Sequence, residues 1–91
     1  GYPPMCNLSA RFTVPPIPAR EVLASLSRKY EKYHPLTFDG LRFDLEEGRI
    51  LVRSSNTEPI MRLNVEADDR PTAEALLNRF TEEIEQELAS L

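Results

Sequence analysis

The sequence predicts one α+β domain in which a four-stranded antiparallel sheet carries two helices on one face. Four segments alternate apolar and polar residues with a period of two, which is typical of half-buried strands. Two longer segments repeat apolar residues at helical spacing. The length of 91 residues suits a single domain of two packed layers.

The first strand and the first helix are separated by prolines. Leu8 and Phe12 alternate with polar neighbours until Pro15-Pro16, where backbone donors for a strand ladder are missing. Pro18 suits an early helical position, and apolar residues then recur at helical spacing as far as Tyr30. His34-Pro35 is expected to end this helix, because the residue before a proline disfavours helical angles.

Three further strands are expected at residues 41–46, 50–53 and 61–67, where the alternation returns. Asp39-Gly40 is a turn signal before the first of them. Glu46-Glu47-Gly48 is interpreted as a tight hairpin with Gly48 at a positive φ. The predicted order of elements is therefore β-α-β-β-β-α.

The last element is predicted to be a helix of roughly five turns, given ~3.6 residues per turn. Asp68, Asp69 and Thr72 offer capping oxygens around Pro71, so Asp68-Asp69-Arg70 is interpreted as a helix start and not as a metal site. Apolar residues from Leu76 to Leu88 should face the sheet. Four glutamates are expected to form the solvated face: Glu82, Glu83, Glu85 and Glu87.

Composition excludes several classes of function. A net charge of −4 and a pI near 5.0 argue against a nucleic-acid surface. No apolar run approaches the ~18 residues that a membrane span requires. Cys6 is the single cysteine, which rules out an intrachain disulfide and favours the cytoplasm. His34, the single histidine, is interpreted as a helix-end residue, while Tyr30 and Tyr33 are expected to pack against the sheet.

The segment 53–62 is the part of the chain whose chemistry is most specific. It reads Arg-Ser-Ser-Asn-Thr-Glu-Pro-Ile-Met-Arg, with small polar side chains between two strands and an arginine on each flank. A phosphate monoester needs a planar cationic fork, hydroxyl donors and exposed backbone N–H groups. Arg53, Ser55, Thr57 and Asn56 can supply these donors, and Pro59 fixes the exit of the loop. The alternative is a polar turn whose side chains satisfy their own backbone.

The run from Arg53 to Pro59 closely resembles the phosphate-binding loop of the α-D-phosphohexomutase superfamily, which lies in the fourth, C-terminal domain of those enzymes. The resemblance extends to Asp39-Gly40, to Glu66-Ala67 and to the terminal amphipathic helix, and so covers essentially the whole chain. It implies a TATA-binding-protein-like fold. Residues 1–5 would be an interdomain linker or the remnant of a cut segment, and residues 6–91 the phosphosugar-binding domain.

The resemblance also assigns roles to residues. Arg53, Ser55, Asn56 and Thr57 would hold the substrate phosphate that is not being transferred. Asn56 resembles the phosphomannomutase/phosphoglucomutase branch, since the phosphoglucosamine mutase branch typically has Gly there. Three further residues would support the site: Glu58, Pro59 and Arg62. Arg62 is expected to supply a supporting charge or an interdomain contact, and Glu58 to turn away or to orient an arginine.

The resemblance implies a longer parent enzyme that interconverts hexose 1-phosphate and hexose 6-phosphate through a phosphoserine and a 1,6-bisphosphosugar. Neither the serine segment nor the aspartate-rich magnesium loop of the family occurs in this chain. The chain alone is therefore expected to hold no catalytic residue and no metal, and magnesium is implied for the parent. Expected partners are a hexose phosphate and the parent's other domains, with no nucleic acid and no membrane. Alternatives are a freestanding phosphosugar-binding module and a structural interaction domain without an anion site.

Overall fold

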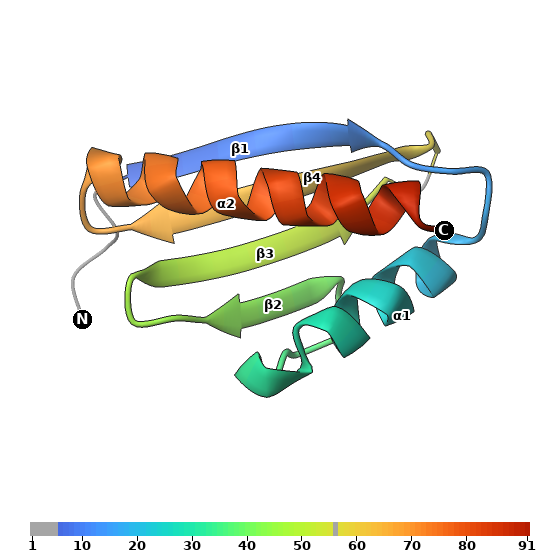
Figure 1. The fold of residues 1–91 in the computed structure, drawn as a ribbon, viewed down its shortest axis with the longest axis horizontal. Helices are drawn as coiled ribbons and strands as arrows, with labels where there is room; N and C mark the ends of the chain where they lie inside the picture. Colours follow the sequence, from blue (N-terminus) through green and yellow to red (C-terminus); the bar gives the residue numbers. More distant parts are fainter. Residues whose placement is uncertain (1–5, 56) are drawn as a thin grey trace.

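The computed structural model describes residues 6–55 and 57–91. The linker expected at residues 1–5 and the predicted site residue Asn56 lie outside them. The chain forms the strands β1 (Cys6–Thr13), β2 (Leu41–Asp44), β3 (Gly48–Ser54) and β4 (Ile60–Ala67), with the helices α1 (Ala19–Lys29) and α2 (Arg70–Ala89). A short 3-10 turn, η1 (Glu31–Tyr33), follows α1. The predicted order β-α-β-β-β-α is confirmed (Figure 1).

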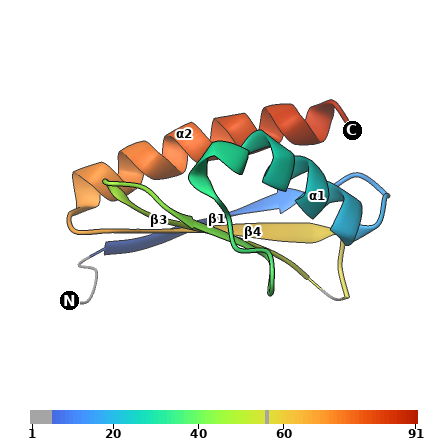
Figure 2. The ribbon, with the colours of Figure 1, turned by 90° about the horizontal axis from the view of Figure 1, so that it is seen from below.

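The strands form one antiparallel sheet in the order β1-β4-β3-β2. Figure 1 shows α2 lying along β1 and β4, with α1 towards the β2 edge. Both helices lie on the same side of the sheet, as Figure 2 shows from a second direction. This confirms the predicted two-layer arrangement and leaves the other face of the sheet uncovered by helices.

The core fills the space between the sheet and the two helices. Alternate residues of each strand point into it, because successive side chains in a strand face opposite sides. Phe80 of α2 and Phe43 of β2 lie with ring centroids 5.7 Å apart near its centre. The strand residues in this core are Phe12, Leu41, Phe43, Ile50, Val52, Met61, Leu63, Val65 and Ala67, and the helices add Val22, Leu26, Ala73, Leu76, Phe80, Ile84 and Leu88. No helix within residues 6–55 and 57–91 is long and apolar enough to span a bilayer.

The hairpin between β2 and β3 differs from the prediction for Gly48. Of the described glycines, Gly40 has the positive φ, at 100°, whereas Gly48 is the first residue of β3 and pairs with Ala67. A Cβ at position 48 would lie 2.2 Å from the carbonyl oxygen of Glu66 and 3.0 Å from Cδ1 of Leu76. Close approach of β4 and α2 therefore explains this glycine, and the prediction of a positive φ is wrong.

The first helix ends earlier than expected, at Lys29, and the chain continues into the 3-10 turn, where the Tyr33 N–H donates to the Tyr30 carbonyl at 2.9 Å. Tyr30 is 2% exposed, and its ring centroid lies 5.1 Å from that of Phe43. Tyr33 stacks on the same phenylalanine at 5.1 Å, which confirms that both tyrosines pack against the sheet. His34 follows the 3-10 turn in the left-handed conformation, with φ of 52°.

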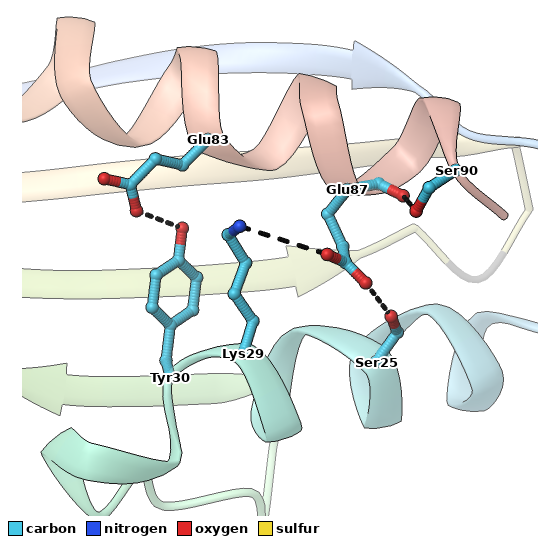
Figure 3. Close-up of polar contacts among 6 residues, drawn as sticks. All are labelled: Ser25, Lys29, Tyr30, Glu83, Glu87 and Ser90. Atoms are coloured by element: carbon cyan, nitrogen blue, oxygen red, sulfur yellow. Dashed lines mark hydrogen bonds and ion pairs between the residues drawn. The ribbon is translucent and has the colours of Figure 1, made fainter.

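The second helix begins as predicted but is not uniformly solvated on its acidic side. Asp69 is the N-cap, and the Thr72 backbone N–H donates to its carboxylate at 2.8 Å, which lowers the pKa of that carboxyl. Glu83 and Glu87 are half-buried and face α1, so their assignment to a solvated face is wrong (Figure 3). Glu82 and Glu85 are exposed, as expected.

Candidate functional site

The loop between β3 and β4 is closed at its base by main-chain hydrogen bonds. The Ser55 N–H donates to the Ile60 carbonyl at 2.9 Å, which continues the β3–β4 ladder by one step. The Val14 N–H donates to the Pro59 carbonyl at 2.9 Å and ties the loop to the end of β1. The polar residues of the loop are therefore held beside the ends of three neighbouring strands.

Ser55 organises the described part of the loop through its side chain. Its hydroxyl oxygen accepts hydrogen bonds from the backbone N–H groups of Thr57 and Glu58, both at 3.3 Å. The serine thus satisfies its own backbone, as the polar-turn interpretation expects. The same geometry makes two successive N–H groups converge on one oxygen atom, which is also what an anion-binding loop requires.

Arg53 and Arg62 lie side by side on the uncovered face of the sheet. Arg53 follows the buried Val52 in β3, and Arg62 lies between the buried Met61 and Leu63 in β4. The two arginines are direct partners in the β3–β4 register. Arg62 therefore points to the face opposite Met61 and Leu63, and the register places Arg53 on that same face.

The register extends this row to a third arginine. Arg11 of β1 pairs directly with Arg62, so Arg11, Arg62 and Arg53 follow one another across three adjacent strands. All three side chains are exposed. The alternation in the sequence places Arg11 on the polar side of its strand, but the pairing of β1 with β4 cannot be read from the sequence. For this reason Arg11 was not predicted as a site residue.

These residues line one open depression of about 300 Å³ where the loop meets the uncovered face. Two predicted phosphate ligands, Arg53 and Ser55, lie in it together with the supporting residues Arg62 and Glu58. The lining residues are Arg11, Arg53, Ser54, Ser55, Glu58, Ile60, Arg62 and Asn64. Glu58 borders the depression in the structure instead of turning away from it.

The structure does not bring every predicted residue to this depression. Thr57 and Pro59 line a neighbouring depression, which the loop forms with the segment between β1 and α1. Ser55 and Glu58 border both depressions. Asn56 lies outside the described residues. The described part of the site is therefore built more from strand arginines than from loop hydroxyl groups.

The depression has an excess of positive charge. Three arginines line it, and Glu58 is the one carboxylate among its described lining residues. Arg53 is paired weakly with Asp39, whose carboxylate lies 3.7 Å from its guanidinium, and both side chains are largely exposed. Within residues 6–55 and 57–91, no ion pair involves Arg11 or Arg62. Such a group of guanidinium forks suits an anion with several acceptor oxygens.

Residues 11–83 match the family model described as phosphoglucomutase/phosphomannomutase, C-terminal domain. A phosphoglucosamine mutase of Methanococcus maripaludis is 37% identical over 78 residues, which cover 82% of this chain and 17% of that protein. A phosphomannomutase of Escherichia coli is 43% identical over 68 residues, covering 72% of this chain and 14% of that protein. The chain therefore spans less than a fifth of the length of these curated relatives.

Proposed function

We propose that this chain, which belongs to the phosphoglucomutase/phosphomannomutase C-terminal domain family, holds the phosphate of a hexose phosphate within a longer phosphohexomutase. The observation that carries the proposal is the cationic depression beside the loop, where Arg53, Arg62 and the Ser55 hydroxyl border one open space. A phosphate monoester carries close to two negative charges near neutral pH and offers three acceptor oxygens. The number and type of donors around the depression suit that group.

The loop backbone supports the same proposal. The N–H groups of Thr57 and Glu58 already converge on one oxygen, that of the Ser55 side chain. A phosphate oxygen that replaced the Ser55 oxygen as their acceptor would find two backbone donors there, with the serine hydroxyl close by. Asn56 and Thr57 complete the proposed ligand set by their match to the family's loop.

The proposed reaction of the parent enzyme converts hexose 1-phosphate to hexose 6-phosphate and back through a phosphoserine and a 1,6-bisphosphosugar. In this scheme the chain binds the phosphate that is not being transferred. A site that recognises the phosphate and not the sugar accepts either end of the bisphosphate after the sugar reorients. Closure of this domain on its neighbours would exclude water from the reacting phosphate.

The reacting serine and magnesium are proposed to belong to the parent's other domains. Among the described residues no three His, Cys, Asp or Glu side chains gather as a metal-binding group, and no step assigned to this chain uses a metal. Asn56 favours the phosphomannomutase/phosphoglucomutase branch of the family, and the cytoplasm is the proposed compartment.

The proposal is tested by Arg53→Ala in the intact parent enzyme. Loss of one charge-assisted contact at this exposed position should cost about 1–2 kcal/mol, which lowers kcat/KM about 5- to 30-fold. Arg42→Ala is the matched control, because Arg42 lies on the same face of the sheet but does not line the depression. Unchanged kinetics in the Arg53 variant, with the protein folded, would remove Arg53 from the substrate site.

A further inference from the structure

The arginine row on the uncovered face joins like charges across two strand pairs. Arg62 has Arg11 as its direct partner on one side and Arg53 on the other. Side chains that face each other across antiparallel strands have Cβ atoms about 5 Å apart, and like charges in such pairs destabilise the sheet. The row is therefore unfavourable for folding, and a stabilising role does not explain it.

Three arginines outside this row form ion pairs with close carboxylates, whereas Arg20, Arg28 and Arg42 form none within residues 6–55 and 57–91. Arg49 meets Asp44 at 2.8 Å, Arg70 meets Glu74 at 2.7 Å, and Arg79 meets Glu83 at 3.1 Å. Arg11 differs from these three, since within residues 6–55 and 57–91 it takes part in no ion pair. Glu85 of α2 borders the same end of β1 without forming such a pair.

Arg11 also borders the depression in which an anion would bind. It lines the depression that contains Arg53 and Ser55, although it lies more than 40 residues earlier in the chain, because β1 pairs with β4 directly beside β3. An anion bound between the loop and the sheet would face one guanidinium group from each of β1, β4 and β3. The anion would relieve the repulsion within the row.

We propose that Arg11 is a further phosphate-binding residue, which extends the site from the loop onto the first strand. This inference rests on the proposed function, since it assigns an additional ligand to the same phosphate. Because β1 is an edge strand of the sheet, Arg11 closes the side of the depression opposite β2. The residue supplies charge and hydrogen-bond donors to the phosphate, and it takes no part in the chemistry of transfer.

The test is a titration of the 91-residue chain with glucose 1-phosphate, followed by amide NMR at low salt. Arg11→Gln should weaken the affinity about fivefold, as expected for an exposed charge contact. Arg11→Lys should recover part of this loss, because the charge returns without the planar fork. The matched control Arg42→Gln should bind like the unchanged chain, since Arg42 lies on the same face outside the depression.

Thermal unfolding without ligand separates a binding role from a structural one. Removing a like charge opposite Arg62 should raise the unfolding midpoint of Arg11→Gln by about 2 °C at low salt, and added salt should reduce this gain. A lower midpoint together with unchanged affinity would show that Arg11 acts structurally and would overturn the inference.

The inference and the proposed function can fail separately. If Arg11→Gln binds like the unchanged chain while Arg53→Gln binds more weakly, Arg11 is not a ligand and the phosphate site remains. If the loop amides of the unchanged chain do not respond to glucose 1-phosphate, both the inference and the proposed function are overturned for this chain.

Discussion

Gly40 allows the turn before β2 to pack closely against β3, beside Arg53. Its φ is 100°, a conformation that side-chain-bearing residues rarely adopt. A Cβ at this position would lie 2.4 Å from the carbonyl oxygen of Val52 and 3.2 Å from Cγ of Arg53. The glycine therefore lets the turn before β2 pass directly against the strand that carries Arg53, and Asp39 reaches the guanidinium group from that turn.

Gly48 is required for a different reason, and this difference can be tested. Both Gly48→Ala and Gly48→Asn should destabilise the chain by about 2 kcal/mol, because any Cβ would collide with the Glu66 carbonyl oxygen at 2.2 Å. Urea unfolding of the two variants measures this cost. A turn glycine at positive φ would instead accept asparagine better than alanine, so a clear advantage for Gly48→Asn would contradict the strand assignment.

At the scale of elements, the two helices are joined by polar contacts as well as by the core. The Tyr30 hydroxyl donates to Glu83 at 2.9 Å, and the Ser25 hydroxyl donates to Glu87 (Figure 3). The Lys29 ammonium lies 4.0 Å from the same Glu87 carboxylate. These contacts fix α1 against the middle and the end of α2, and they explain why two of the glutamates of α2 are half-buried.

The contact between Tyr30 and Glu83 predicts a stability loss that depends on pH. Tyr30→Phe should cost about 1 kcal/mol at pH 7, because Glu83 keeps Arg79 as a partner at 3.1 Å. Burial, followed by the hydrogen bond to Glu83, raises the pKa of the Tyr30 phenol. The folded state therefore holds this proton more tightly than the unfolded state, so the stabilisation is complete below about pH 10 and is lost as the pH rises further.

Urea unfolding at pH 7 and pH 11 measures this effect. The stability difference between the unchanged chain and Tyr30→Phe should shrink at the higher pH. Tyr33→Phe is the control. The half-buried Tyr33 accepts a hydrogen bond from Arg79 at 2.9 Å, and losing this bond leaves the contact between Tyr30 and Glu83 in place. An equal difference at both pH values would contradict the assigned role of Tyr30.

Most elements could be predicted from the sequence because each has its own periodic pattern. The alternation in 61–67 and the capping signal at Asp69 depend on neighbouring residues, and both are confirmed. The end of α1 at Lys29 could not be predicted, because the apolar helical spacing continues to Tyr30, which caps the helix and packs on a phenylalanine of a later strand. The half-buried state of Glu83 and Glu87 likewise depends on α1, which lies more than 50 residues earlier.

The same distinction applies to the candidate site. The loop could be predicted because its polar residues are contiguous from Arg53 to Pro59. Arg11 could not, because its place beside Arg62 depends on which strands pair and in which register. A row of like residues across a sheet leaves no periodic signal along the chain.

At the scale of the whole molecule, the uncovered face of the sheet carries more arginines than carboxylates. The net charge is −4, yet each strand carries at least one arginine on the uncovered face. Helix α2, whose sequence is rich in glutamate, lies on the opposite side of the sheet (Figure 2). An anionic domain can therefore present a cationic surface to a phosphate, and binding there should weaken as salt screens the arginines.

The most direct test of the phosphate site is amide chemical-shift mapping of the 91-residue chain with glucose 1-phosphate, using neutral glucose as the control. We expect millimolar affinity, on the order of 4 kcal/mol, with shifts concentrated at Arg53, Ser55, Thr57 and Arg62 and absent with glucose. Equal shifts with glucose, or no response of these amides to the phosphate, would contradict the assignment of a phosphate site to this chain.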